Sequence, residues 1–344
     1  MRRHAGVLHL QDKVSSPQGT FCPIPVAVDR LDDRRMTQIS AQPSTFVMPF
    51  YSDQPKALIH AIESVRSVVA QTDPNWRLVI VDDCSPLPRR LRRRQLAQLQ
   101  ALDPDRIVVI ANEVNRGQGV CRNIGIDWAH RAGSPIVLFQ DADDIAHPRR
   151  LEVTRAVMRD GTVDFVYSPF TVIDEDGNQP TPGDITPSVT EILEALDRHP
   201  AEGRDCWITI ATQTGYLTLT STVSVSTDLA RRHPFPDCRG SEDTHAFLRM
   251  SGGGGVFSYQ PDIPAKYRVR TAGGSADRAR IGRRAYYATK VRIDCDGFEK
   301  ACRLALARGA VTRMQIAELR TQFRSRLAET IRNEGFAELV SAAW

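Results

Sequence analysis

The sequence predicts an α/β fold with a mostly parallel sheet, helices on both faces of the sheet, and an additional helical segment at the C-terminal end. Short apolar segments alternate along the first half of the chain with longer segments in which apolar residues recur every three or four positions. This alternation of strands and helices implies right-handed crossovers between parallel strands. With 344 residues and 41% apolar content, the chain can bury one large core or two modest ones.

The expected elements follow one another from residue 45 in regular strand–helix order. Strands are expected at residues 45–50, 77–81, 107–110, 136–139 and 164–168, and helices at about 57–71, 87–102, 120–132 and 148–158. A proline-rich polar insert follows at 178–206, and it contains an apolar pattern that predicts a short helix at 189–196.

Two less regular segments complete this part of the chain. Residues 174–178 are typical of a hairpin-like turn. Residues 207–227 carry no charge, but Thr and Ser are frequent and alternate with apolar residues at 216–220, so we expect strands and loop rather than a membrane span. After residues 241–243 the pattern is again helical, until the glycines at 252–255 end it.

The pattern divides the chain into three parts. Residues 1–42 lack a sustained period and are expected to be a partly ordered extension. Residues 43–277 hold the predicted sheet and form the main domain. Residues 278–344 carry apolar side chains at helical spacing, which predicts helices that pack on the main domain. The alternative for these helices is a homodimer contact or a peripheral membrane face that uses Arg280, Arg283, Arg284 and Lys290.

Charge and cysteine content limit the partners and the compartment. The net charge of +4 is too small to indicate a nucleic-acid partner. Five arginines between residues 89 and 94 are typical of the exposed face of a helix, and the alternative is a patch for an acidic partner. The seven cysteines are scattered and include no Cys-x-x-Cys pair, and no signal-peptide core is present. We therefore expect a cytoplasmic protein with reduced thiols, with peripheral contact at the inner face of the membrane as the alternative.

Three carboxylates, those of Asp141, Asp143 and Asp144, directly follow the apolar strand 136–139. In an open α/β sheet, ligands bind outside the carboxyl ends of the strands. Crowded carboxylates repel one another unless a cation lies among them, and Mg²⁺ typically shares its coordination between one or two carboxylates and substrate phosphates. The alternative is a solvated acidic turn in which Asp143 or Asp144 caps the next helix.

Polar residues follow the other strand ends as well. Tyr51 and the pair Asp82 and Asp83 stand where a nucleotide base could stack and be hydrogen-bonded. As alternatives, Asp83 caps the next helix and Tyr51 is a core aromatic residue. Gly117 permits close approach to a phosphate, and Arg122 could supply positive charge, although an ordinary turn and a surface arginine would give the same pattern.

Five short segments occur in the order typical of one enzyme family. They are FVMPFYS at 46–52, VDDCS at 81–85, NRGQGVCRNIG at 115–125, QDADD at 140–144 and SED at 241–243. From residue 45 to about residue 275, this combination resembles the inverting family-2 glycosyltransferases of GT-A fold. Each segment alone is a weak signal, but their common order, each at the end of a strand or helix, is specific.

The resemblance implies a metal-dependent single displacement that moves a sugar from a UDP-linked donor to a hydroxyl of a glycan, a lipid-linked acceptor or a small molecule. Donor contacts are implied at Pro49, Tyr51, Asp82, Asp83, Asn115, Gly117, Arg122, Asp141 and Arg270. Mn²⁺ or Mg²⁺ is implied at Asp143 and Asp141. Asp243 is implied as the general base that takes the proton of the acceptor, whereas the alternative is that Glu242 and Asp243 only supply negative charge to a helix N-terminus.

The sequence departs from the family pattern at three positions. Ser52 replaces Asn, Cys84 replaces Gly, and Arg270 stands where the family often has a His that reaches the metal or phosphate. An arginine cannot ligate a metal, but it can neutralise a diphosphate directly. These departures leave open a second hypothesis, a family member that binds nucleotide sugar or glycan without turnover. A sugar-phosphate nucleotidylyltransferase is disfavoured, because it would have a Gly-rich basic loop at residues 50–53.

Overall fold

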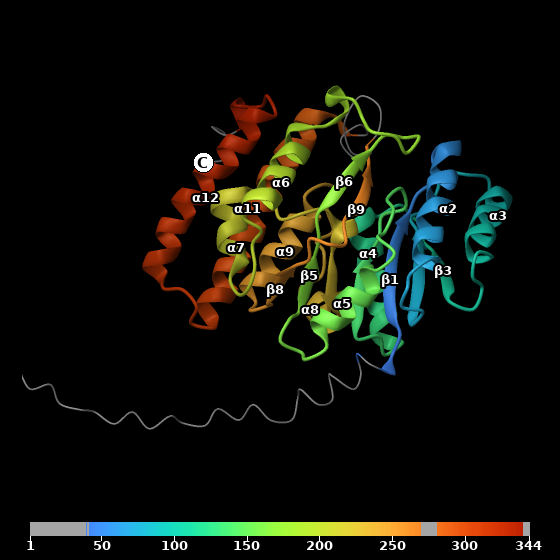
Figure 1. Cartoon of the computed structure of the whole chain (residues 1–344). Coiled ribbons are helices and arrows are strands. Elements are labelled where there is room, and N and C mark those ends of the chain that lie inside the picture. The colour runs from blue at the N-terminus through green and yellow to red at the C-terminus, as the bar shows by residue number, and fades with distance from the viewer. Residues whose placement is uncertain (1–38, 40, 270–280, 340–344) are drawn as a thin grey trace, which may run out of the picture.

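The computed structural model describes residues 39, 41–269 and 281–339 (Figure 1). The described strands are β1 (Ser44–Phe50), β2 (Trp76–Asp82), β3 (Ile107–Ala111), β4 (Ile136–Phe139), β5 (Phe165–Tyr167), β6 (Phe170–Ile173), β7 (Ser224–Ser226), β8 (Phe257–Tyr259) and β9 (Ala265–Arg268). The described helices are α2 (Pro55–Val69), α3 (Arg89–Gln100), α4 (Gln118–Arg131), α5 (Arg150–Met158), α6 (Pro187–Arg198), α7 (Cys206–Thr209), α8 (Thr227–Arg232), α9 (Glu242–Gly252), α11 (Arg283–Ala307) and α12 (Arg313–Asn333). Shorter turns are the 3₁₀ helices η1 (Pro182–Asp184) and η3 (Thr220–Thr222) and the π-helix η2 (Ile210–Thr214).

Within the described residues, seven strands form one sheet in the order β3-β2-β1-β4-β7-β5-β8, and β6 pairs separately with β9. All pairings in the large sheet are parallel except those of β7 with β4 and β5. Val47 of β1 lies opposite Val79 of β2 and Phe139 of β4. Because these three strands end at the same edge, the segments that follow them meet there. The prediction of a mostly parallel α/β sheet is therefore confirmed.

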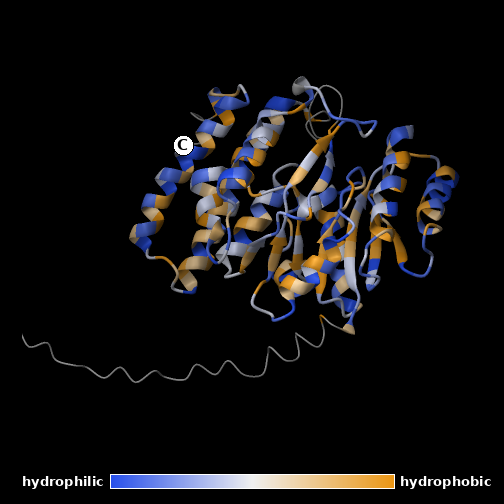
Figure 2. Ribbon diagram, in the orientation of Figure 1, coloured by the Kyte–Doolittle hydropathy of each residue, from blue (hydrophilic) through white to orange (hydrophobic). Residues whose placement is uncertain are grey.

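Both faces of the sheet are buried. In β1, Val47 belongs to one hydrophobic cluster, whereas Phe46 and Met48 on the opposite face belong to another. Helices α2, α3 and α5 cover the face of Phe46, and helices α4 and α9 cover the face of Val47. This double coverage explains why the strands are continuously apolar and do not alternate with polar residues. Figure 2 shows the hydrophobic residues gathered on the central strands and hydrophilic residues along the outer helices.

The glycine of the Arg-Asn-x-Gly segment has a packing role. A Cβ atom on Gly125 of α4 would lie 2.2 Å from Cγ1 of Val47 in β1. No side chain fits at that separation, so the absence of a side chain at residue 125 lets α4 lie directly on the sheet. This contact brings the N-terminal half of α4, including Arg122, over the carboxyl edge of the strands.

Two local predictions were only partly right. The segment 216–220 is not a strand, and the preceding residues form α7 and η2. Trp207 and Ile210 are buried there at helical spacing, and the tertiary packing of these side chains outweighs the strand preference of the many Thr residues. Residues 174–178 do form a turn, closed by the N–H of Asp174 donating to the carbonyl of Asn178. No hairpin follows, because β6 pairs in parallel with β9.

The C-terminal helices pack on the main domain, as expected. α11 lies so close to α9 that a Cβ on Gly252 would meet the backbone of Ala301 at 2.8 Å. Arg283 and Arg284 are exposed, but Lys290 is only 2% exposed. The alternative, in which Lys290 takes part in an outer dimer or membrane face, is therefore wrong for this residue. The backbone spacing of α9 and α11, together with the buried side chains of α11, makes this helix a part of the core.

Some predictions concern residues outside the described ranges, namely the extension up to residue 38, Arg270 and Arg280. The described cysteines, Cys84, Cys121, Cys206, Cys238, Cys295 and Cys302, are free thiols. In the run of arginines at 89–94, Arg92 is half-buried and pairs with Asp82, while the other four are exposed. No helix among the described residues has the length and apolar character needed to cross a membrane.

Candidate active site

A cavity of about 310 Å³ opens at the carboxyl edge of the sheet. Five of the predicted site residues line it, namely Pro49, Tyr51, Asp141, Asp143 and Asp243. Asp82, Asp83, Asn115, Gly117 and Arg122 are not among the lining residues. Arg270 is outside the described residues. The fold thus brings together residues from the ends of β1 and β4 and from the start of α9.

Several hydrogen bonds hold Asp141 in place. Its Oδ1 accepts from Nη2 of Arg122 at 2.7 Å, and its Oδ2 accepts from the hydroxyl of Thr220 at 2.8 Å. Its backbone N–H donates to Oγ of Ser221 at 3.0 Å. The carboxylate remains 25% exposed toward the cavity, so its orientation is fixed while its remaining lone pairs stay available to a ligand.

Arg122 is a buried link between two motifs. Besides Asp141, its guanidinium donates from Nη1 to Oε1 of Glu242 at 2.9 Å, and it is 1% exposed. Burial disfavours its charge, but the carboxylates of Asp141 and Glu242 raise its pKa above the usual value for arginine. Arg122 was predicted to contact the donor phosphates. Instead, it joins the acidic segment after β4 to the start of α9.

The other two acids after β4 differ from each other. Asp143 is half-buried and lines the cavity, whereas Asp144 is 1% exposed. Asp144 accepts from the hydroxyl of Ser221 and from the backbone N–H of Arg268. Burial, and then the charges of Asp143 and Asp141, raise the pKa of Asp144 well above its ordinary value. Asp144 therefore stabilises the turn, and Asp143 is the residue of this pair that faces a ligand.

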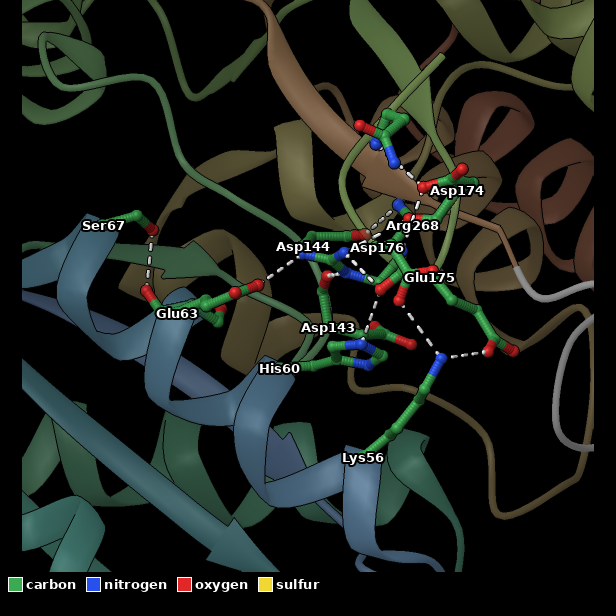
Figure 3. Close-up of polar contacts among 12 residues, drawn as sticks. Lys56, His60, Glu63, Ser67, Asp143, Asp144, Asp174, Glu175, Asp176 and Arg268 are labelled. Carbon is green, nitrogen blue, oxygen red and sulfur yellow. Dashed lines mark hydrogen bonds and ion pairs between the residues drawn. The ribbon is translucent and has the colours of Figure 1, made fainter. Parts of the chain in front are cut away.

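Arg268, at the end of β9, holds this acidic turn from the other side (Figure 3). Its Nε donates to the carbonyl of Asp143 at 2.9 Å, and its Nη2 donates to Oε2 of Glu63 on α2 at 2.7 Å. Its Nη1 donates to the carbonyl of Glu175 at 2.9 Å. The sequence pattern assigned this arginine no role. Its contacts lie far apart in the sequence, so no local pattern could reveal them.

Lys56 and His60 of α2 contact the turn at residues 174–176, near the cavity. Nζ of Lys56 lies 3.1 Å from Glu175 and 3.2 Å from Asp176, and Nε2 of His60 lies 2.9 Å from the carbonyl of Glu175 (Figure 3). The ion pairs are exposed, so they contribute little to stability. The turn at 174–176 thereby closes one side of the cavity against α2.

Asp83 organises the glycine-bearing loop before α4. Its two carboxylate oxygens accept from the backbone N–H groups of Arg116 and Gly117, at 2.8 and 2.7 Å. Nδ2 of Asn115 donates to the carbonyl of Asp83 at 2.8 Å. Gly117 has a φ of +89°, which favours glycine. The predicted alternative for Asp83, a cap on the next helix, is wrong, because that helix is α3 and its N-terminus has no side-chain cap. Asp83 instead holds the loop that precedes α4.

The two neighbours of Asp83 also have structural partners. Asp82 is fully buried and accepts from Ser85 and from Nε of Arg92. Cys84 has a φ of +56°, in the left-handed region where the family pattern has Gly. A side chain in this conformation costs about 1 kcal/mol or more, so the replacement strains the loop without preventing it.

Asp243 lies in the first turn of α9, half-buried at the cavity wall. The two residues before α9 have left-handed backbone conformations, with a φ of +89° at Gly240 and +60° at Ser241. Oγ of Ser241 accepts from Nζ of Lys290 at 3.2 Å, and Nζ also bonds Asp294 at 2.7 Å. Lys290 thus fixes the loop that delivers Asp243. Sequence reasoning missed this role, because a Lys–Asp pair four residues apart usually marks an exposed helix face.

Among the residues that the structure describes, no three His, Cys, Asp or Glu side chains are grouped to hold a metal ion. The side chains nearest to such a role are the cavity-facing carboxylates of Asp141 and Asp143. Two carboxylates are sufficient only where a ligand supplies further oxygen atoms.

The sequence model of a family described as Glycosyl transferase family 2 matches residues 45–224, just over half of the chain. The chain belongs to this family. The matched residues of this family-2 chain include β1, β4 and Asp141 to Asp144, whereas Asp243 and the C-terminal helices lie beyond them.

Curated relatives match about a third of the family-2 chain. A putative teichuronic acid biosynthesis glycosyltransferase, TuaG of Bacillus subtilis, is 33% identical over 115 residues, which are 33% of this chain and 43% of the relative. The UDP-Glc:alpha-D-GlcNAc-diphosphoundecaprenol beta-1,3-glucosyltransferase WfgD of Escherichia coli is 28% identical over 130 residues, which are 38% of this chain and 46% of the relative. In both cases the match spans less than half of the relative.

Solved structures confirm the GT-A fold of the family-2 chain. TarS 1-349 of S. aureus in complex with UDP-GlcNAc is 17% identical, with a TM-score of 0.52, over 88% of this chain and 84% of that chain. Its complex with UDP is 16% identical, with a TM-score of 0.50, over 88% and 87% of the two chains. At this identity the likeness establishes the fold.

Proposed function

We propose that the protein is a metal-dependent inverting glycosyltransferase that moves a sugar from a UDP-linked donor to an acceptor hydroxyl by single displacement. The observation that carries this proposal is the convergence of Asp141, Asp143 and Asp243 on one cavity. These side chains come from two segments far apart in the sequence, and Arg122 connects the segments through Asp141 and Glu242. Family membership supports the choice of donor, and so does the relative WfgD, whose name specifies UDP-Glc.

Asp243 has the role of general base in this proposal. An alcohol has a pKa far above neutrality, so its proton must leave as the new C–O bond forms. A carboxylate within hydrogen-bonding reach of that hydroxyl accepts the proton and accelerates such a step by about 10²–10⁴-fold. Asp243 is half-buried at the cavity wall, where it can meet both the acceptor and solvent.

The donor set fits a divalent cation that the substrate helps to coordinate. Asp141 and Asp143 face the cavity, and their oxygens are the hard ligands that Mn²⁺ and Mg²⁺ prefer. Because no third protein ligand accompanies them among the described residues, the donor diphosphate would complete the coordination. When bound, such a cation stabilises the negative charge of the departing nucleoside diphosphate. Arg122 and Thr220 keep the carboxylate of Asp141 oriented for this contact.

The nucleotide end of the donor is assigned to the end of β1. Pro49 and Tyr51 line the cavity, and the half-buried ring of Tyr51 offers a face to a base. In this proposal Asp83 and Asn115 act by shaping the adjacent loop, and Asp82 acts by anchoring it. The donor contact of Arg270 stays a prediction.

A thermal-shift screen tests this function. UDP-, GDP- and dTDP-sugars are added to the whole protein, each with and without Mn²⁺. We expect a UDP-sugar to raise the melting temperature only when Mn²⁺ is present, since a ligand that binds only the folded state stabilises it more as its concentration exceeds its Kd. Stabilisation by no donor under either condition would overturn the proposal. Binding without sugar transfer to any of a panel of acceptors would instead favour a member that binds without turnover.

A further inference from the structure

The cavity extends past Asp243 into an end whose wall contains none of the residues that we assign to the donor. Its wall there is formed by α6, by the residues after η2, and by α11. Three half-buried tyrosines line this end, Tyr216, Tyr267 and Tyr286, together with the buried ammonium of Lys290. Apart from Tyr216, these residues lie beyond the part of the chain that matches the family model.

Contacts locate this end on the side of the proposed base. The ring of Tyr286 packs against Gly240, where a Cβ atom would lie 2.6 Å from its Cε2. Nζ of Lys290 donates to Oγ of Ser241, which follows Gly240 and lies two positions before Asp243. Tyr51 and α2 border the cavity from the opposite side, and α6 and α11 lie across the β6–β9 pair from α2 (Figure 1).

The geometry of a single displacement assigns the occupant of this end. In such a reaction, the incoming hydroxyl attacks the sugar carbon from the side opposite to the departing diphosphate. The general base must lie on that same side in order to take the proton. The acceptor therefore occupies the end of the cavity next to Asp243, between Tyr286 of α11 and the earlier residues Tyr216 and Tyr267.

The charges around the cavity disfavour an anionic acceptor. Among the described lining residues, the cations are Lys56, Arg268 and Lys290, and the acids are Asp141, Asp143, Glu175, Glu242 and Asp243. Each of these cations already has a carboxylate partner. Nζ of Lys290 also lies 4.4 Å from the centroid of the Tyr216 ring, so the ammonium already contacts an aromatic face besides its hydrogen-bond partners. A phosphate or carboxylate entering here would meet no uncommitted cation among the described lining residues.

The tyrosines suit a sugar ring instead. An aromatic face is apolar, whereas its hydroxyl is polar, so a tyrosine can cover the C–H face of a sugar while leaving hydroxyl groups to hydrogen-bond. We propose that Tyr216, Tyr267 and Tyr286 form the acceptor subsite, and that this subsite takes an uncharged sugar ring. This inference rests on the proposed function, and it adds the chemical class of the acceptor and the role of α11.

The first test uses the native protein, Mn²⁺ and the donor found in the thermal-shift screen. Methyl glycosides of glucose, galactose, mannose and N-acetylglucosamine are compared with methyl glucuronide and glucose 6-phosphate. We expect at least one neutral glycoside to be used with kcat/KM at least about tenfold above that of either anion. Equal or better use of an anionic acceptor would overturn the inference, even though it would uphold the proposed function.

The second test changes the aromatic wall. Tyr286→Ala should raise the acceptor KM about tenfold or more, and Tyr286→Phe, which keeps the ring, should change it less than threefold. Arg303→Ala, an exposed change on the same helix and away from the cavity, serves as the control. Calorimetric binding of UDP with Mn²⁺ checks that each variant is folded. An unchanged acceptor KM in a Tyr286→Ala variant that binds UDP would overturn the inference. If the native protein does not bind UDP with Mn²⁺ in the same experiment, the result would instead count against the proposed function.

Discussion

Arg122 donates a hydrogen bond of 2.7 Å from Nη2 to Oδ1 of Asp141. The arginine lies on α4 with 1% of its surface exposed, whereas the aspartate faces the cavity. The same guanidinium holds Glu242, the neighbour of Asp243. Two acidic segments with different proposed roles therefore share one buried cation, and their relative position depends on it.

Removal of that cation should be strongly destabilising. Arg122→Gln removes the guanidinium that pairs with the buried Glu242 and the partly buried Asp141, and breaking a buried ion pair in this way costs about 3–5 kcal/mol. Urea unfolding measures the change. Arg116→Gln is the matched control, because its ion pair with Asp237 is exposed and worth about 0–1 kcal/mol. Similar losses in the two variants would contradict the structural role of Arg122.

A buried histidine should make stability sensitive to acid. Nε2 of His245 lies 2.7 Å from Asp296, and Nδ1 accepts from Nε of Arg249 at 3.2 Å, which is the arrangement of a neutral ring. Burial, and then the charge of Arg249, lower the pKa of His245 to about 4. The folded pKa lies below that of the unfolded chain. The unfolded state therefore binds more protons as pH falls, and the contribution of His245 is complete above about pH 6.5 and lost toward pH 4.

The size of this acid effect is on the order of 3 kcal/mol for His245. Urea unfolding at a series of pH values from 7 to 4.5 measures it for the native protein and for His245→Gln. The variant should be less stable at pH 7, and its free energy of unfolding should fall less steeply with acid. Identical slopes in the two proteins would rule out this histidine as the source.

The close contact of α4 with β1 predicts a specific pattern of stability. Gly125→Ala should cost about 1–3 kcal/mol, because the new methyl group overlaps Val47. Val47→Ala removes the overlapping atoms, so the double variant should lose less stability than the sum of the two single changes. Thermal or urea unfolding of all three variants forms the cycle. Strict additivity would show that the helix moves away instead of overlapping.

Much of this architecture follows from local pattern, as β4 illustrates. Four apolar residues followed by Asp141 and Asp143 predicted both the strand and the acids at its end, and the structure confirms the strand and brings both acids to the cavity. The pairing partners could not be predicted in the same way. Arg122 looks like a surface arginine in the sequence, because its burial depends on Glu242, which is more than a hundred positions away.

The errors have a related physical origin. Residues 216–220 alternate like a strand, yet Tyr216 and Leu219 border the cavity beside α6 and α11. A period of two describes a strand only when the segment pairs with a neighbour, and tertiary packing decided otherwise here. Lys290 similarly has helical neighbours typical of a surface, and only the packing of α11 on α9 buries it.

The acidic turn should depend on Arg268. Arg268→Gln removes the donors to the carbonyl of Asp143 and to Glu63, so the turn that carries Asp143 loses two of its supporting contacts. Loss of such a supporting contact typically weakens metal binding about 10–100-fold. The concentration of Mn²⁺ that half-saturates the thermal shift with a UDP-sugar measures this effect. Arg149→Gln, an exposed change on the surface near α5, should leave that concentration unchanged. Equal Mn²⁺ dependence in both variants would remove Arg268 from the site.

The central claim is that Asp243 takes the proton of the acceptor. Its most direct test is Asp243→Asn, which keeps the shape of the side chain and removes its basicity, with Asp237→Asn as an exposed control. For Asp243→Asn, we predict that kcat for sugar transfer falls at least about 100-fold, while the Kd of the donor with Mn²⁺ stays within twofold of that of the native protein. Transfer by the Asn variant at the native rate would contradict the account.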